Sequence, residues 1–194
     1  MKKIIITILV AALILFGASF ALQGTAAKNA QEQHLWLLET LLPGEEDFVK
    51  VPYDGEDANI RSVHKNENGF VIETVSYGYA GDIRMYVAVN KDARVVGLVV
   101  REAHETYGLG SRILTDHVFL AQFLNKSGSF EIAAHGADAF SGATAEAQPE
   151  GEGIQIDGIS GATVSSKAVA RCVNSAVAYV TGADAVSSAT TWGG

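Results

Sequence analysis

Residues 157–166 combine small, acidic and hydroxyl-bearing side chains in the pattern of an anion-binding turn. They lie directly before an apolar segment with helical spacing, so the turn leads into a helix N-terminus. Such a turn exposes backbone N–H groups at the positive end of the helix dipole, where phosphate is the usual ligand. The hydroxyls that could bind phosphate oxygens belong to Ser160, Thr163, Ser165 and Ser166. The alternative is a helix that these hydroxyls cap and that carries no ligand, because Ser and Thr are common caps.

The helix that follows this turn has the strongest amphipathic pattern downstream of the N-terminal region. Between 165 and 180 apolar residues recur every three or four positions, which predicts a helix with one buried face. That face holds Ala168, Val169, Cys172, Val173, Ala176 and Val177. Since Cys172 is the single cysteine, no disulfide can form within the chain, and we expect a buried structural thiol rather than a reactive one.

Three segments upstream of this helix predict strands. The runs 70–79, 83–89 and 95–100 are rich in β-branched and aromatic residues and are separated by turn residues. They predict an antiparallel meander, with Ile83, Met85, Val87 and Val89 on one face of the middle strand.

Helices and loops are expected on either side of these strands. An amphipathic helix at 34–42 should end at Pro43-Gly44, and a second helix at 116–124 should bury Val118, Phe119 and Phe123. A glycine-bearing loop is expected at 102–112 and an irregular loop at 133–153. The predicted fold class is therefore α+β, an antiparallel sheet flanked by helices.

The N-terminus carries a membrane signal. Lys2 and Lys3 precede an uncharged run from Ile4 to Leu22, which as a helix spans about 28 Å, close to the roughly 30 Å of a bilayer core. The lysines favour a cytoplasmic N-terminus, with the rest of the chain outside. We expect one transmembrane anchor, the alternative being a signal peptide cleaved after Ala21. The expected organisation is an anchor or signal at 1–22, a stalk at 23–33, an extracytoplasmic domain at 34–182 and a flexible tail at 183–194.

Composition excludes some classes of function. With 14 basic and 22 acidic residues the net charge is −8, which argues against nucleic-acid binding. The five histidines are scattered without metal-ligand spacing, so no metal site is predicted. No motif of a catalytic centre that turns over a small substrate is present.

The segment from Asp157 to Thr163 resembles the flavinylation motif of the FMN-binding domain family. That family includes the G subunit of the Rnf ferredoxin:NAD oxidoreductase complex and the C subunit of the sodium-translocating NADH:quinone oxidoreductase. The resemblance implies that the Thr163 hydroxyl forms a phosphoester with FMN and that a separate flavin transferase makes this bond from FAD. Asp157, with Ser160, Gly161 and Ala162, is then the motif that the transferase reads.

A second stretch carries the same resemblance. Residues 104–110, His-Glu-Thr-Tyr-Gly-Leu-Gly, are similar to a family loop, Glu-Thr-Pro-Gly-Leu-Gly, that lies against the isoalloxazine ring. Tyr107 stands where the family has Pro, which would have fixed the backbone φ angle. The resemblance implies that the ring is contacted by His104, Glu105, Thr106, Gly108 and Leu109.

The flavinylation motif has a second copy. Asp138–Thr144 repeats Asp-x-x-Ser-Gly-Ala-Thr, nineteen residues before the copy that ends at Thr163. An acidic run cut by Pro149 and Gly151 follows Thr144, so no stable helix can start there. Thr163 instead leads into a long helix with Lys167 in its first turn. This context favours Thr163 over Thr144 as the acceptor.

The resemblance implies an electron-transfer subunit of a membrane-bound, Rnf-type ion-translocating oxidoreductase, which is not catalytic alone. Its partners would be other membrane subunits and the flavin transferase. Two alternatives stay open at this point. One is a stand-alone, membrane-anchored FMN carrier in an extracellular electron-transfer chain. The other is a flavin-free secreted binding module, in which 160–166 only caps a helix.

Overall fold

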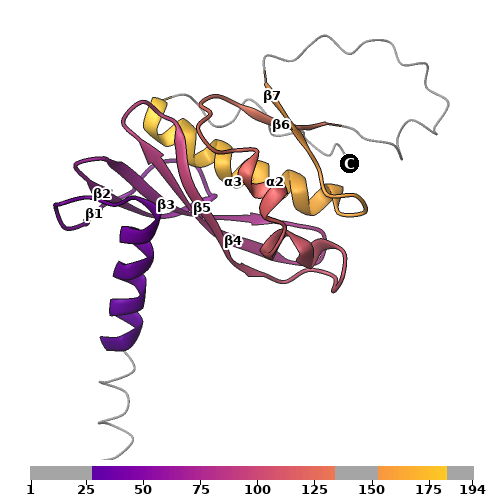
Figure 1. The fold of residues 1–194 in the computed structure, drawn as a ribbon, viewed down its shortest axis with the longest axis horizontal. Helices are drawn as coiled ribbons and strands as arrows, with labels where there is room; N and C mark the ends of the chain where they lie inside the picture. The colour runs from indigo at the N-terminus through magenta and orange to yellow at the C-terminus, as the bar shows by residue number, and fades with distance from the viewer. Residues whose placement is uncertain (1–27, 134–152, 183–194) are drawn as a thin grey trace, which may run out of the picture. The chain divides into compact units, whose positions relative to one another are not determined.

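The computed structural model describes residues 28–133 and 153–182 (Figure 1). The chain divides into two compact units, Met1–Thr40 and Leu41–Gly194. Among the described residues no helix is both long and apolar enough to span a bilayer. The apolar run 4–22, the tail 183–194 and the motif copy 138–144 all lie outside the described residues.

Residues 28–41 are helical, and the helix ends just before Pro43-Gly44, as the sequence predicted. Helical residues 28–33 fall in the stretch that the sequence assigned to a stalk. The predicted amphipathic helix is therefore longer on its N-terminal side than its leucine spacing indicated.

The second unit is built on a five-stranded antiparallel meander in chain order. Its strands are β1 (Val49–Val51), β2 (Ile60–Asn66), β3 (Gly69–Tyr77), β4 (Asp82–Asn90) and β5 (Val95–Ala103). The three predicted strands are confirmed as β3, β4 and β5, and β3 pairs with β4 over its full length. The sequence prediction missed β1 and β2. Arg61 and Lys65 of β2 are exposed and interrupt the apolar pattern on which that prediction rested.

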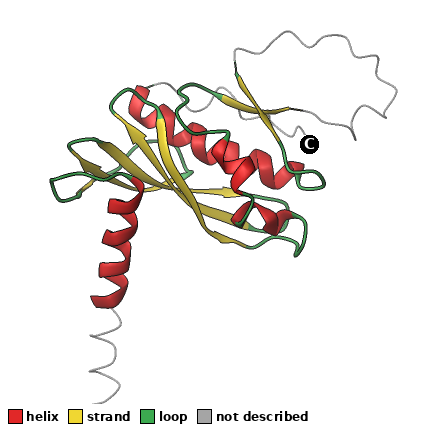
Figure 2. Ribbon diagram, in the orientation of Figure 1, coloured by secondary structure: helices red, strands yellow, loops and turns green. Residues whose placement is uncertain are grey.

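The long helix α3 (Thr163–Thr181) lies across one face of this sheet (Figure 2). The middle of the core joins Ile72, Met85 and Val87 of the sheet to Val169 and Val173 of α3, and each of these side chains is fully buried. The predicted apolar face of β4 is confirmed, since Ile83 and Val89 are also fully buried. Burial of so many apolar side chains, at about 25 cal/mol per Å², is what fixes α3 on the sheet.

Two short elements connect the sheet to the rest of the domain. They are η1 (Gly110–Leu114), a 3-10 helix, and α2 (His117–Ala121), whose first turn is capped by the Asp116 carboxylate accepting from the Phe119 N–H at 3.0 Å. Phe119 and Phe123 are buried as predicted, but the prediction for Val118 is wrong, because its side chain is 81% exposed. Neighbouring helical residues point about 100° apart, so a five-residue helix that buries Phe119 turns Val118 away.

A second, two-stranded sheet pairs β6 (Phe130–Ala133) and β7 (Ile154–Asp157) in parallel. The sequence prediction missed both strands, and Ala133, expected to begin an irregular loop, ends β6. Each strand has four residues, and its partner is more than twenty residues away in the chain, so no local turn signal marks the pairing. β7 ends at Asp157 and so leads the chain directly into the predicted anion-binding turn.

Cys172 is confirmed as a buried structural thiol, with no exposed surface. Burial raises the pKa of this thiol to about 12. Between its ordinary value of 9.0 and about 12 the folded chain keeps a proton that the unfolded chain loses. Folding stability therefore decreases as pH rises through this window.

We predict that Cys172→Ala flattens this alkaline loss. The wild-type free energy of unfolding should fall by up to about 1.4 kcal/mol per pH unit from this thiol alone. The variant should start about 1 kcal/mol lower at neutral pH because of the small cavity, and the gap should narrow as pH rises. Urea unfolding at several pH values from 7 to 10.5 measures this. Burial also raises the pKa values of Tyr86 and Tyr179, but both tyrosines are present in the wild type and in the variant, so their effect cancels in the comparison. Curves of unfolding free energy against pH that run parallel for the two proteins would contradict the prediction.

Candidate functional site

The turn before α3 is fixed by its own hydrogen bonds. The Ala162 N–H donates to the Ile159 carbonyl at 2.9 Å, and Gly161 has φ +78°, as the third position of a type II turn requires. The Ser166 hydroxyl accepts from the Ile159 N–H at 3.0 Å and donates to the Ala162 carbonyl at 3.0 Å. Ser166 therefore ties the turn to the first turn of α3 rather than capping the helix.

The N-terminus of α3 has no side-chain cap. Its N-cap residue is Ala162, and the helical hydrogen bonds begin with the Ser166 N–H on the Ala162 carbonyl at 2.8 Å. The N–H groups of the first turn are thus left for another acceptor. The interpretation of 160–166 as only a helix cap fails here, because the capping position carries no hydroxyl.

Two hydroxyls of the motif differ in their surroundings. Thr163, the first residue of α3, is exposed, so its hydroxyl is accessible from solvent. Ser165 is 1% exposed, and within the described part of the chain its Oγ has no hydrogen-bond partner. A buried hydroxyl without a partner is costly, so a group that supplies one is expected beside it.

The second predicted motif, the loop 104–110, is tied to the turn 78–81. The Glu105 carboxylate accepts from the Tyr79 N–H at 2.7 Å and from the Ala80 N–H at 3.3 Å. The His104 N–H donates to the Asp82 carbonyl at 3.1 Å. A Cβ at Gly78 would overlap the Glu105 carboxylate, so any other residue there would displace this carboxylate from the Tyr79 and Ala80 N–H groups.

The same loop also meets α3, which brings the two sequence motifs together. A Cβ at Gly110 would lie 2.6 Å from Glu105 Oε2 and 2.7 Å from Ser165 Oγ. A Cβ at Gly161 would lie 3.3 Å from Leu109 Cδ2. Gly110 therefore lies between Glu105 and Ser165, and Leu109 lies over the turn that precedes Thr163.

Most predicted site residues lie at the surface of this junction. Glu105 is half-buried, and the exposed residues are His104, Thr106, Gly108, Leu109, Asp157, Ser160, Gly161 and Thr163. His104 pairs its Nε2 with Glu102 Oε1 at 3.3 Å, while the Gly108 N–H donates to Ser111 Oγ at 3.0 Å. Tyr107, which stands in place of the family proline, is 96% exposed.

The sequence analysis missed the residues that position these motifs. The Gln122 carboxamide binds the backbone of Asp157, and Gly110 provides the close approach to α3. Arg171 donates from Nε to Ser76 Oγ at 2.9 Å and from Nη2 to the Tyr77 carbonyl at 2.7 Å, which fixes the strand end before Gly78. Gly110 was visible as the last residue of the loop motif. Gln122 and Arg171 carry no sequence signal of this role, because they bind main-chain atoms or a distant serine.

The comparisons with known proteins match this part of the chain. The family model described as FMN-binding domain matches residues 78–178, from the Gly78 turn through most of α3. The G subunit of an ion-translocating oxidoreductase complex from Methanosarcina acetivorans is 30% identical over 77% of this chain and 76% of its own length. The G subunit of a proton-translocating ferredoxin:NAD(+) oxidoreductase complex from Clostridium ljungdahlii is 27% identical over 93% of this chain and 89% of its own.

Among solved structures, the crystal structure of Shewanella oneidensis NqrC is 23% identical, covers 69% of this chain and 64% of its own, and has a TM-score of 0.45. The family model spans just over half of the chain, and the Methanosarcina relative is aligned over three quarters of it. On these matches, the chain belongs to the FMN-binding domain family.

Proposed function

We propose that this chain is an electron-transfer subunit of an Rnf-type ion-translocating oxidoreductase and carries FMN bound covalently to Thr163. The relatives aligned over most of the chain are named as G subunits of such complexes. The observation that carries the proposal is the exposed Thr163 hydroxyl at the first position of a helix N-terminus without a side-chain cap.

The attachment step is a group transfer from FAD. The Thr163 hydroxyl oxygen forms a bond to the phosphorus of the FMN half, and the P–O–P bond of FAD breaks. AMP leaves with the bridging oxygen, and the hydroxyl proton passes to solvent. The flavin transferase supplies the catalytic groups for this step, while this chain supplies the acceptor and the motif from Asp157 to Thr163.

The residues present fit an FMN phosphate on Thr163. The uncapped N–H groups of the first turn of α3 can donate to its oxygens, and the helix dipole favours its negative charge. Ser165 Oγ, buried and without a partner in the described part of the chain, gives a further polar group beside the same turn. Lys167, exposed one turn along α3, adds a positive charge on the same helix.

The loop 104–110 offers a surface for the isoalloxazine ring. Leu109, 48% exposed, lies over Gly161 beside the acceptor turn, and Val164 next to Thr163 is 43% exposed. An apolar ring that covers such side chains removes them from water. When bound, FMN supplies the redox chemistry, and the protein's part is to hold the ring and leave an edge open for electron exchange.

A covalent link has a physical rationale on the outer side of a membrane. The helix dipole contributes about 0.3–1 kcal/mol to binding a phosphate, whereas nanomolar retention needs about 12 kcal/mol. A phosphoester retains the flavin without this binding free energy, so a shallow and exposed site is sufficient. The surface around Thr163 fits such a site, because Thr163, Leu109 and Tyr107 are all exposed.

The proposal includes membrane attachment through the run 4–22, an extracytoplasmic domain at 34–182 preceded by a stalk, and contacts with other membrane subunits of the complex. A stand-alone membrane-anchored carrier is the second candidate, and it shares the flavin site. The flavin-free module is disfavoured, because the N-cap position of α3 holds Ala162 and no hydroxyl of the motif caps the helix.

We predict that Thr163→Ala abolishes flavin attachment. Each chain is co-expressed with an active flavin transferase, denatured, and examined by in-gel flavin fluorescence and intact mass. The wild type should gain the mass of FMN less one water. Thr163→Ser, which keeps a hydroxyl, should retain the gain, and Thr144→Ala should equal the wild type. Loss only in Thr144→Ala would show that the acceptor is the other motif copy, and no flavin in any sample would refute the proposal.

Glu105 is expected to position the ring loop rather than attach the flavin. Glu105→Ala leaves the N–H groups of Tyr79 and Ala80 without their carboxylate, so the loop 104–110 should become more mobile. The free energy of unfolding should fall by about 1–3 kcal/mol. The intact mass should still show FMN on Thr163, while the flavin fluorescence anisotropy should fall. Glu102→Ala, which removes the exposed partner of His104, is the matched control and should keep the wild-type anisotropy. Equal anisotropy in all three proteins would contradict this role.

A further inference from the structure

We propose that Gln122 is a positioning residue for flavin attachment, acting through the backbone of Asp157. This inference rests on the proposed function, since it concerns the presentation of Thr163 to the transferase. It adds a residue outside both sequence motifs, on the segment that follows α2.

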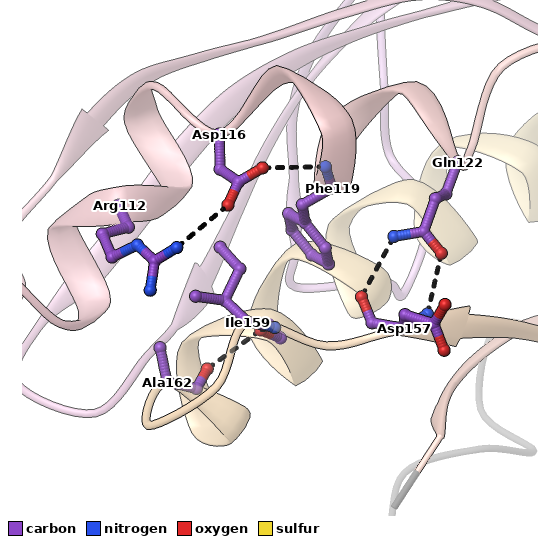
Figure 3. Close-up of polar contacts among 8 residues, drawn as sticks. Arg112, Asp116, Phe119, Gln122, Asp157, Ile159 and Ala162 are labelled. Carbon is purple, nitrogen blue, oxygen red and sulfur yellow. Dashed lines mark hydrogen bonds and ion pairs between the residues drawn. The ribbon is translucent and has the colours of Figure 1, made fainter. Parts of the chain in front are cut away.

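Gln122 binds Asp157 with both ends of its carboxamide. The Asp157 N–H donates to Gln122 Oε1 at 2.8 Å, and Gln122 Nε2 donates to the Asp157 carbonyl at 3.1 Å (Figure 3). A neighbouring strand would bind the edge of β7 by the same N–H and C=O groups. The Gln122 side chain therefore takes the place of a paired strand residue beside Asp157, the last residue of β7.

Asp157 is the first residue of the motif, and only Gly158 separates it from the hydrogen-bonded turn that leads to Thr163. Ile159 and Ala162 are joined by the turn hydrogen bond, and Ser166 binds both of them. This turn moves as a unit, and a displacement of Asp157 reaches it through one intervening residue. The hydrogen bonds of Gln122 therefore fix the backbone two residues before the turn begins.

Gln122 can set this position because it is itself held firmly. Phe119 and Phe123 on either side of it are buried, with ring centroids 5.5 Å apart in an edge-to-face arrangement. The Gln122 N–H donates to the Phe119 carbonyl at 3.3 Å. The Asp116 carboxylate caps the start of α2 and pairs with Arg112 at 3.5 Å (Figure 3).

The chain offers a matched control on the other strand of the same sheet. Asn174 of α3 binds the backbone of Phe130 in β6 by the same two bonds, at 2.8 Å and 3.0 Å. Both amides thus hold one strand of the β6–β7 pair, but Phe130 does not lead into the acceptor turn. Loss of either amide should destabilise the fold to a similar extent, and only loss of Gln122 should disturb attachment.

The test uses the full-length protein isolated without flavin, with purified flavin transferase and FAD. Gln122→Met and Asn174→Leu keep the approximate size of each side chain and remove its two hydrogen bonds. The rate of FMN attachment is followed by intact mass over a range of acceptor concentrations, and urea unfolding of each variant is measured in parallel. Misplacement of a reacting group by about 1 Å can slow a reaction by up to about a hundredfold. We expect kcat/KM for attachment to fall about tenfold or more in Gln122→Met and to stay within about twofold in Asn174→Leu.

Equal rates of FMN attachment in Gln122→Met and the wild type would overturn the inference. It would also be overturned if Gln122→Met and Asn174→Leu lost attachment rate equally and stability equally. Both results leave the proposed function intact if the wild type is flavinylated on Thr163. A wild type that takes up no flavin beside an active transferase would refute the proposed function, and this inference with it.

Discussion

The candidate site depends on the two hydrogen bonds that the Glu105 carboxylate accepts from the turn 78–81. Through them the loop 104–110 is joined to the end of β3, and the glycines that leave room for the carboxylate, Gly78 and Gly110, place the loop against Ser165 of α3. Bonds from backbone N–H groups to a carboxylate are among the stronger hydrogen bonds in proteins. Three segments far apart in sequence therefore meet at one point, beside the exposed Thr163.

The long helix α3 provides the frame for this meeting. Its apolar face is buried on β3 and β4, while polar side chains along its length hold the surrounding elements. Ser166 holds the turn at 159–162, Arg171 the end of β3 and Asn174 the strand β6. The helix thus positions both the turn that precedes Thr163, the proposed acceptor, and, through Arg171, the strand end bound by Glu105. Its N-terminus, which no side chain caps, is left for an anion.

The sequence predicted the parts of the fold that have local signals. The β-branched runs of β3 to β5 and the helical spacing of α3 identify these elements, and the two loop motifs identify the region where FMN is proposed to bind. The polar strand β2 and the parallel pair β6 and β7 lack such signals, because their pairing depends on partners elsewhere in the chain. The exposure of Val118 and the use of the Ser166 hydroxyl within the turn follow from tertiary geometry. For the same reason Gln122, which binds only main-chain atoms of Asp157, could not be identified before the fold was known.

The flavin is proposed to be attached to Thr163, at the N-terminus of α3. Cleavage with trypsin after Lys126 and Lys167 gives a peptide of residues 127–167, which contains both Thr144 and Thr163. The peptide is isolated from protein co-expressed with an active flavin transferase and is sequenced by tandem mass spectrometry. We expect that fragments containing Thr163 but not Thr144 carry the added mass of FMN less one water. The added mass on fragments with Thr144 alone, or an unmodified peptide, would show that Thr163 is not the attachment site.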